Sequence, residues 1–485
     1  MSEDLFAGVR DHIRRDLAES CAPSLAVSVA RNGKILWEEA FGWADREKRI
    51  PATVHTMYSV ASVSKPITAT GLMVLVEQGK IDLDAPVNHY LSRDSQLKIW
   101  MGDPDEVTVR RLASHTSGLP SQCHYYGADE IAGKPTMEES IRRYGNIVAR
   151  PGERYRYSNI GYGIMDHLIA RVSGSSFDDF LRHEVFAPLG MAHASVGMGP
   201  QLAAFEAIRY DETNRPIPFY VSDHAGASEV YLSVHDLACF GMFHLGQTGA
   251  DQKAILLEET RKAMQVPLAS MAPVNLADYN LAAGSHYGLG WVIDNDDLGR
   301  RVSHGGGMGG AASKILMLPD EGIVIATASN QFMPLPWTIE RDILSVLLPG
   351  YAEKSDEHWK ARDALRVQQK SVIFSPVPEL LGEWAGVVRT YDGDFSMTLL
   401  FKDSGDIHAK LEGQLPALVT NARFSEGRFS GSLSGRLNIA DSNRRPWHPG
   451  HHLALELKLR GDVLNGVVVS IVGNSVSQWA EFKKV

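Results

Sequence analysis

The stretch Ser59-Val-Ala-Ser-Val-Ser-Lys-Pro66 sets a hydroxyl and an amine three residues apart at the start of an apolar segment. Residues at this spacing lie on one face of a helix, so the Lys65 amine can reach the Ser62 oxygen within a single local element. A serine hydroxyl is a weak nucleophile at neutral pH, and an adjacent base activates it by taking its proton. The pattern therefore predicts a nucleophile beside its own base.

A second serine precedes a lysine at the same spacing, Ser95 before Lys98, so the spacing alone does not identify a site. The two copies differ in their C-terminal neighbours. Residues 67–76 are mostly apolar and small, and Gly79 supplies a C-terminal stop, which predicts a buried helix after Ser62. Ser95 lies in a polar stretch without such a helix. The Ser62 copy is therefore the candidate.

The composition is that of an ordinary globular protein. The chain has 485 residues, of which 44% are hydrophobic, enough for two or three domains with sizeable cores. The formal net charge is −10 with both signs interspersed, so we expect no nucleic-acid partner and no binding to an anionic membrane. Cys21, Cys123 and Cys239 are far apart and odd in number, which favours a reducing compartment and buried thiols, without metal-ligand spacing.

The N-terminal region predicts a helix and a hairpin. Residues 5–18 have amphipathic spacing, and Asn32-Gly33 separates two strand-like runs at residues 24–31 and 34–41. The first residues lack the basic start and apolar core of a secretory signal. No later window holds the run of about 18 apolar residues that a membrane span needs. We therefore expect a soluble, cytoplasmic protein.

Two loops carry further candidate chemistry. Tyr157-Ser-Asn159 comes shortly before residues 164–172, which have helical apolar spacing. A loop before a buried helix holds its side chains firmly, which suits a phenol that carries a proton and an amide that binds a ligand. Earlier, His115, Thr116 and Ser117 come after a helical turn, and we interpret them as local caps and not as a second catalytic cluster.

A glycine cluster forms the third candidate stretch. Five glycines occupy six positions in Gly305–Gly310, directly after His304. The flanking residues 287–291, 314–318 and 323–328 predict antiparallel strands. Glycines on a strand edge let backbone amides approach a ligand with no side chain in the way.

Taken in order, Ser62-Val-Ser-Lys65, Tyr157-Ser-Asn159 and His304-Gly-Gly306 resemble the S-x-x-K, Y-x-N and K-T-G or H-x-G elements of a known superfamily. It is that of the serine β-lactamases and penicillin-binding proteins, in its class C-like branch with esterases, D-aminopeptidases and D,D-carboxypeptidases. The resemblance covers roughly residues 5 to 348. Four intervening segments also look like the family: Leu112-Ala-Ser-His-Thr-Ser-Gly-Leu119, Pro151-Gly-Glu153, Pro188-Leu-Gly-Met191 and Tyr287-Gly-Leu-Gly-Trp291.

The resemblance implies an α+β fold, in which a β-lactamase-like antiparallel sheet is flanked by helices and stands beside an all-helical region. We place a serine hydrolase domain at residues 1–348 and a linker at 349–378, of which residues 349–370 are charged and helix-like. The helix after Ser62 is expected to be central, with the active site between the sheet edge that carries His304 and the helical region that carries Tyr157.

Roles carry over from the resemblance residue by residue. Ser62 would be the nucleophile, Lys65 and Tyr157 the proton-transfer pair, and Asn159 a ligand to the substrate or to Lys65. A lysine pKa near 10.4 in water must fall by roughly three units for the amine to act as a base at neutral pH. Which of the pair takes the serine proton is left open, because the two groups titrate together.

The resemblance also implies an oxyanion hole made by the backbone amides of Ser62 and Gly307, beside substrate-binding residues His304, Gly305 and Gly306. The family usually has lysine at position 304, where its charge holds a substrate carboxylate, whereas a histidine is mostly neutral at pH 7. No cofactor and no metal are implied.

This departure favours hydrolysis of an ester or small amide through a Ser62 acyl-enzyme. Two alternatives are kept. One is a D-aminopeptidase, D,D-peptidase or β-lactamase acting on D-amino-acid peptides or β-lactams. The other is a non-catalytic binding protein, against which the intact Ser62, Lys65 and Tyr157 argue. The expected partner is a small molecule or short peptide, and the oligomeric state is left open, with a homodimer as one option.

The C-terminal residues 379–485 change character to short alternating runs separated by turn residues, which predicts a small antiparallel barrel. It resembles the lipocalin-like barrels of some D-aminopeptidases. Two uses are weighed, binding an apolar ligand or capping the active site, and the second is favoured through the loop Asn438–Gly450. The runs are 381–390, 395–402, 407–412, 417–424, 428–437, 452–459, 463–472 and 477–482, and the loop residues of interest are Arg444, Arg445, Trp447 and His448.

The long segment from Gln201 to Ser285 is expected to supply walls of the substrate pocket. Its candidate contacts are Tyr220, Glu229 and Tyr231, with plain surface positions as the alternative for each of them.

Overall fold

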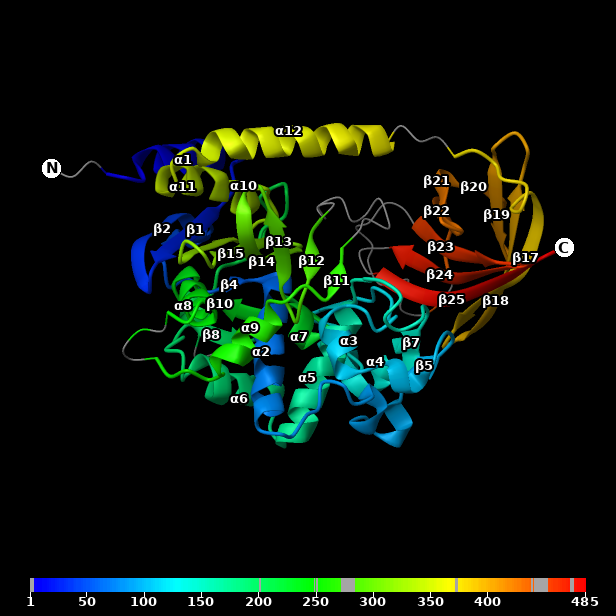
Figure 1. Ribbon diagram of the computed structural model, residues 1–485, viewed down its shortest axis with the longest axis horizontal. Helices are drawn as coiled ribbons and strands as arrows, with labels where there is room; N and C mark the ends of the chain where they lie inside the picture. The colour runs from blue at the N-terminus through cyan, green and yellow to red at the C-terminus, as the bar shows by residue number, and fades with distance from the viewer. Residues whose placement is uncertain are drawn as a thin grey trace.

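The computed structural model describes residues 4–199, 202–247, 249, 252–271, 284–370, 374–437, 439, 452–471 and 475–485. A large antiparallel sheet with helices on both faces occupies the left and centre of Figure 1, and a barrel lies on the right. Helix α12 (Tyr351–Lys370) runs along the top from the first toward the second. The mixed helix and strand class is as predicted, and α12 falls within the predicted linker.

The main sheet has nine strands in the order β11-β12-β13-β14-β15-β16-β1-β2-β3. The predicted N-terminal hairpin is present as β1 and β2, with Asn32 and Gly33 at positive φ in the turn. Because β1 also pairs with β16, the two ends of this part of the chain share one sheet. The bounds are β1 (Ser24–Arg31), β2 (Lys34–Asp45), β3 (Ile50–Pro51), β11 (Ala269–Ser270), β12 (His286–Tyr287), β13 (Val292–Asp296), β14 (Gly299–Met308), β15 (Ala311–Leu318) and β16 (Ile323–Ser329).

Alternate residues of each strand face opposite layers, as the side-chain period of two requires. Leu25 and Val27 of β1 pack into a cluster with α1 (Ala7–Ser20), α10 (Leu335–Thr338) and α11 (Glu340–Leu347). Ala26 and Ala30 face the other layer, where α8 (Val234–His244) lies on β1, β15 and β16. The central strands β1, β15 and β16 are therefore buried on both faces.

Helix α2 (Ser64–Glu77) lies at the centre of the helical region, below the sheet in Figure 1. Every residue from Ser64 to Leu75 is buried, as the small apolar sequence predicts. Its neighbours include α5 and α7, which both contact it. The other elements are α3 (Val109–Ala113), α4 (Met137–Tyr144), α5 (Asn159–Ser173), α6 (Phe177–Leu181), α7 (Ala225–Ser228), α9 (Glu258–Met264), β4 (Tyr58–Ser59), β5 (Lys98–Ile99), β6 (Tyr125–Gly127), β7 (Asn146–Ile147), β8 (Ala194–Val196), β9 (Tyr220–Ser222) and β10 (Val230–Leu232).

The C-terminal strands form a nearly closed antiparallel barrel in the order β20-β19-β18-β17-β25-β24-β23-β22-β21. The predicted run 417–424 divides into β20 and β21, so nine strands replace the eight expected runs. The capping loop Asn438–Gly450 lies, apart from Ile439, outside the described residues. The bounds are β17 (Gly382–Thr390), β18 (Gly393–Phe401), β19 (Ile407–Leu411), β20 (Ala417–Leu418), β21 (Thr420–Ser425), β22 (Arg428–Ser434), β23 (His452–Arg460), β24 (Val463–Ile471) and β25 (Ser475–Lys484).

Two expectations need correction. The strand predicted at residues 287–291 ends at Tyr287, because Gly290 (φ +86°) lies so close to α2 that a Cβ there would be 3.0 Å from the Pro66 Cα. The chain turns at this contact, and β13 begins only afterwards. Among the cysteines, Cys123 and Cys239 are buried free thiols as expected, but Cys21 is exposed.

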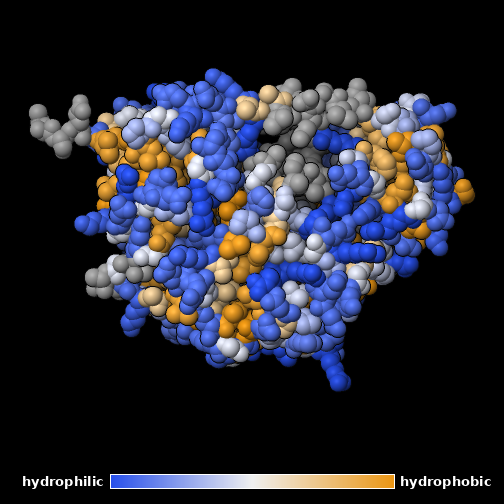
Figure 2. Space-filling model, viewed as in Figure 1, coloured by the Kyte–Doolittle hydropathy of each residue, from blue (hydrophilic) through white to orange (hydrophobic). Residues whose placement is uncertain are grey.

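The surface mixes hydrophilic and hydrophobic residues. Figure 2 shows blue hydrophilic residues over most of the visible face, with separate orange patches at the left edge, the centre and the barrel. None of the helices in the described ranges is both long enough and apolar enough to span a bilayer.

Substitution by alanine is expected to have opposite effects on stability at two helix glycines, Gly241 in α8 and Gly8 in α1. A Cβ at Gly241 would lie 2.4 Å from Val324 Cγ1 of β16, whereas a Cβ at Gly8 in α1 meets nothing within 4 Å. We expect Gly241→Ala to destabilise the protein by about 1–3 kcal/mol through overpacking. Gly8→Ala should be neutral or stabilising by up to about 1 kcal/mol. Thermal melts of the two variants beside the parent test this, and equal Tm values for both would contradict it.

Candidate active site

The predicted serine and lysine meet at the start of α2. A short 3₁₀ turn, Ala61–Val63, carries Ser62 immediately before the helix, and Lys65 Nζ lies 3.2 Å from Ser62 Oγ. Lys65 is fully buried, while Ser62 is partly exposed. The hydroxyl is therefore open to a substrate, while the amine behind it is shielded from solvent.

The Lys65 amine has two further partners. Nζ donates to Asn159 Oδ1 at 2.8 Å and to the Ala227 carbonyl at 2.9 Å. Both acceptors are neutral oxygens, so they compensate little of the cost of burying a charge. Burial lowers the pKa of Lys65 to about 7. The amine therefore exists in comparable neutral and protonated fractions near neutral pH, as a base acting there requires.

Tyr157 is a second partner of the Ser62 hydroxyl. Its hydroxyl donates to Ser62 Oγ at 2.9 Å, and its ring lies 4.7 Å from Lys65 Nζ. Burial raises the pKa of Tyr157 above its ordinary value, so the group stays a phenol at neutral pH. The next residue, Ser158, caps α5 by accepting from the Gly161 amide at 3.1 Å, which fixes where the helix starts and where the tyrosine leaves it.

The glycine cluster lies on a free strand edge, as predicted. Residues 299–303 of β14 pair with β13 and residues 302–308 pair with β15, so that residues 304–308 pair, within the described strands, with β15 alone. The other edge faces the Ser62 turn so closely that a Cβ at Gly306 would lie 2.1 Å from the Val60 carbonyl oxygen. Ser313 of β15 donates to the same carbonyl at 2.7 Å. Only glycine at position 306 permits this approach.

His304 is buried at the head of this edge. Its Nδ1 lies 2.8 Å from the Gly305 carbonyl, which can only accept, so the proton sits on Nδ1 and Nε2 accepts from the Tyr287 hydroxyl at 3.0 Å. Burial, and then the nearby Lys65, lower the pKa of His304 to about 3. The imidazole is thus neutral and supplies no fixed positive charge.

His115, interpreted from the sequence as a local cap, also lies against the tyrosines near Ser62. It is fully buried at positive φ, and its ring centroid lies 4.5 Å from that of Tyr157 and 4.7 Å from that of Tyr287. Nδ1 accepts from the Ser158 amide at 3.1 Å, and its carbonyl accepts from the Arg156 amide at 2.7 Å. Its residue type gave no signal, because histidine is an ordinary residue near a helix C-terminus.

The predicted pocket-wall residues are all buried, so none is a plain surface position. The Tyr220 hydroxyl donates to the Gly309 carbonyl at 2.6 Å, which brings it to the glycine cluster. Glu229 instead accepts from the Ser222 amide at 2.7 Å, and Tyr231 lies in β10, paired with β4. Tyr220 is therefore the candidate among the three that reaches an element of the site.

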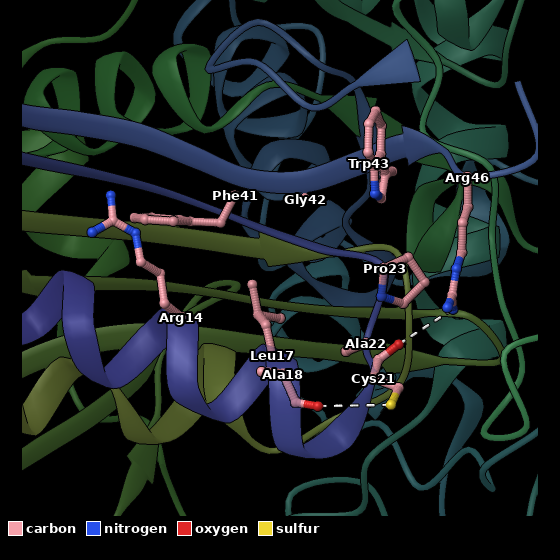
Figure 3. Close-up of a pocket in the computed structure, with 10 residues that line it drawn as sticks. All are labelled: Arg14, Leu17, Ala18, Cys21, Ala22, Pro23, Phe41, Gly42, Trp43 and Arg46. Atoms are coloured by element: carbon pink, nitrogen blue, oxygen red, sulfur yellow. Dashed lines mark hydrogen bonds between the residues drawn. The ribbon is translucent and has the colours of Figure 1, made fainter. Parts of the chain in front are cut away.

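Two cavities are lined by residues other than Ser62, Lys65 and Tyr157. One of about 490 Å³ lies between α1 and β2 and is lined by Arg14, Leu17, Phe41, Trp43 and Arg46 among others (Figure 3). The other, of about 410 Å³, adjoins the end of the glycine cluster. Its lining residues are Tyr210, Asp211, Glu212, Thr213, Ile217, Met308, Gly309, Gly310 and Phe332.

One group of side chains in the described part of the chain has metal-ligand geometry. The group consists of Asp296, Asp297 and His358. These residues come from β13, its adjoining turn and α12, none of which carries Ser62, Lys65 or Tyr157. Both oxygens of Asp296 already accept from Arg301 at 2.8 Å, so this carboxylate is committed to an ion pair.

The chain was compared with known proteins. The sequence profile of the Beta-lactamase family matches residues 9–345. The chain belongs to the β-lactamase family. It is 28% identical to Penicillin-binding protein 4* of Bacillus subtilis over 330 residues, which span 63% of this chain and 67% of that protein. Against Protein flp of Staphylococcus aureus it is 23% identical, and the match covers 66% of this chain and only 63% of that relative.

Solved structures show the same fold. An octameric penicillin-binding protein homologue from Pyrococcus abyssi superposes with a TM-score of 0.60 at 22% identity and covers 98% of this chain and 99% of its own. SurE with D-Leu gives 0.61 at 19% identity, covering 99% of both chains. A class C β-lactamase gives 0.59 at 20% identity, covering 70% of this chain and 96% of its own. The family match confirms the resemblance to the β-lactamases and penicillin-binding proteins, and the class C β-lactamase shares its fold.

The environments of two histidines predict opposite charge states. His304 should stay neutral down to pH 5, because burial lowers its pKa to about 3. His235 should stay protonated at pH 7.5, because hydrogen bonds to Cys239 and Glu38 raise its pKa to about 9. Nitrogen-15 NMR of histidine-labelled protein between pH 5 and 8 measures both, with His304→Gln and His235→Gln assigning the signals. Titration of His304 near pH 6.5 would contradict the first expectation.

Proposed function

We propose that this member of the β-lactamase family is a serine hydrolase that cleaves an ester or a small amide through a Ser62 acyl-enzyme. The observation that carries the proposal is the convergence of Lys65 Nζ and Tyr157 OH on one hydroxyl oxygen, at 3.2 and 2.9 Å. A serine with two proton-transfer groups in hydrogen-bond contact is the arrangement that nucleophilic catalysis needs.

The shifted pKa values of Lys65 and Tyr157 suit the two groups to different proton transfers. Lys65, with a pKa of about 7, has a substantial neutral fraction that can accept the Ser62 proton during attack. Tyr157 stays a phenol because burial raises its pKa, so it is suited to pass a proton to the leaving group and not to serve as the first base. The Asn159 oxygen, 2.8 Å from Nζ, orients the amine toward the serine. Water then attacks the acyl-enzyme and the proton transfers run in reverse. Tyr157 takes a proton from the water and Lys65 returns one to Ser62, which releases the acid.

The developing oxyanion would be held by the amides of Ser62 and Gly307. Gly307 lies on the exposed part of the free β14 edge, and Gly306 brings that edge against the Ser62 turn. Each such donor contributes about a hundred- to a thousandfold in rate. Gly305 and Gly306 accordingly serve through their backbone, as substrate-binding positions.

The choice of substrate rests on His304. A neutral, buried imidazole that already has two partners offers no charge to a substrate carboxylate, unlike a lysine at this position. This favours esters and small amides. The runner-up, cleavage of D-amino-acid peptides or β-lactams, is supported by the similarity to Penicillin-binding protein 4* and to SurE, whose structure holds D-Leu.

Removing the nucleophile tests the proposal, and the second serine-lysine pair supplies a matched control. Ser62→Ala should lower turnover of p-nitrophenyl acetate and butyrate by at least a thousandfold, because the acyl-enzyme cannot form. Ser95→Ala should keep parental activity, because the Ser95 side chain pairs only with Ser92 in the described structure, at 2.8 Å. D-alanine p-nitroanilide and nitrocefin are assayed beside the esters.

Ester turnover that survives in Ser62→Ala would contradict the proposed nucleophile. Anilide or nitrocefin turnover exceeding ester turnover, and lost in Ser62→Ala, would instead favour the runner-up substrates.

The buried amine predicts the pH dependence. The neutral amine is the active form, so kcat/KM should rise with pH through a pKa of about 7 and level off above pH 8. Lys65→Met should abolish this activity, while Lys98→Met, which removes an exposed lysine, should leave rate and profile unchanged. Initial rates from pH 5 to 9 measure this. An acid limb centred near pH 10 would mean that Lys65 is not the base.

A further inference from the structure

We propose that the C-terminal barrel positions Tyr157 through an ion pair between Glu456 of the barrel and Arg156. We call this ion-paired contact the brace, and Arg156 and Glu456 are its positioning residues. The inference rests on the proposed function, because it concerns the proton carrier of that site. It assigns the barrel a part in the reaction through its strands, independently of any loop over the pocket.

The barrel presents a charged stripe to the segment that carries Tyr157. Leu455 and Leu457 of β23 point into the barrel core, so the alternating Glu456 and Lys458 lie on its outer face. Arg428 of β22 stands directly opposite Lys458 in the strand register. Three charged side chains therefore lie side by side on two neighbouring strands.

Ion pairs join this stripe to the Tyr157 segment. Arg156 Nη2 lies 2.7 Å from Glu456 Oε2, with only 11% and 20% of the two side chains exposed. Glu153 Oε1 accepts from Arg428 at 3.0 Å and from Lys458 at 2.5 Å. Pairs this shielded are screened less than surface pairs, and loss of one partner leaves the other charge poorly solvated.

Arg156 connects the barrel to the catalytic loop. Its side chain is held by Glu456, while its amide donates to the His115 carbonyl at 2.7 Å. On the other side of Tyr157, the Ser158 amide donates to His115 Nδ1. Tyr157 thus stands between two residues anchored on His115, one of which is also tied to the barrel. A shift of Arg156 therefore moves the phenol relative to Ser62.

The barrel is also attached to the helical region by contacts other than the ion pairs. Cys123 and Ser475 exchange two backbone hydrogen bonds of 3.0 Å, as in an antiparallel sheet, and Ser477 Oγ donates to the Ser121 carbonyl at 2.7 Å. The Trp100 and Trp479 rings stack nearly parallel, with centroids 5.9 Å apart. The barrel therefore contacts the helical region at points well separated along the chain, and it is not held by the ion pairs alone.

The test neutralises the pair while keeping its shape. The variants are Glu456→Gln, Arg156→Gln and the double variant, with Glu383→Gln as the matched control because Glu383 is an exposed glutamate of β17 in the same barrel. Four quantities are measured on the full chain: kcat and KM for p-nitrophenyl butyrate, Tm, and the rate of hydrogen exchange of the Arg156 and Ser158 amides.

We expect Glu456→Gln and Arg156→Gln each to lower kcat about tenfold with KM within twofold, because small misplacements of a catalytic group are costly in rate. The double variant should be no worse than either single variant, because both remove the same pair. Exchange at Arg156 and Ser158 should become at least tenfold faster in all three variants. Tm should fall below that of Glu383→Gln in the single variants, because each leaves one charge of the shielded pair without its partner.

Parental kcat and parental amide exchange in Glu456→Gln would overturn the brace. Additive losses in the double variant would also overturn it, since the two residues would then act separately. If the parent turned over none of the substrates, the proposed function would fail, but the exchange measurement needs no substrate and would still decide whether the barrel holds the Tyr157 segment.

Discussion

The burial of one lysine is the constraint on which the rest of the site depends. An ammonium in an apolar helical core is costly, and the chain places Lys65 there with neutral oxygens from Asn159 and Ala227 as partners. Those oxygens come from the start of α5 and from α7, so both helices must pack on α2 for the amine to be satisfied. The unusual protonation behaviour is therefore a property of three packed helices and not of a local motif.

The barrel and the sheet-and-helix part are not independent in their packing. One continuous cluster of buried apolar residues includes Leu72 of α2 and Leu168 of α5 together with Trp384 and Phe482 of the barrel. Tyr144 of α4 also meets Tyr391 edge to face. We therefore expect the barrel and the sheet-and-helix part to unfold together. The division of the chain at residues 348 and 378 stays a prediction about sequence organisation.

Much of this fold was predictable because its signals are local. The Asn32-Gly33 turn, the small apolar residues of α2 and the alternation of the barrel strands each come from a short window of sequence. What could not be predicted around the candidate site involves distant partners. The strand expected through Trp291 is interrupted because Gly290 meets α2, and His115 gained its place from tyrosines that lie far along the chain. The pairing of Arg156 with Glu456 joins positions that no sequence spacing relates.

The close approach of Gly306 to the Val60 carbonyl limits which residues near the candidate site can change during evolution. Any side chain there would collide with the Val60 carbonyl, so this stretch of strand is closed to substitution as long as the serine turn lies against it. New substrate preferences in the proposed site must then arise from surrounding positions. Phe332 is an example, because it lies beside Gly307 and is nearly half exposed. In the proposed site, the backbone of this strand is therefore the part that cannot vary, and changes in selectivity during evolution are confined to the surrounding side chains.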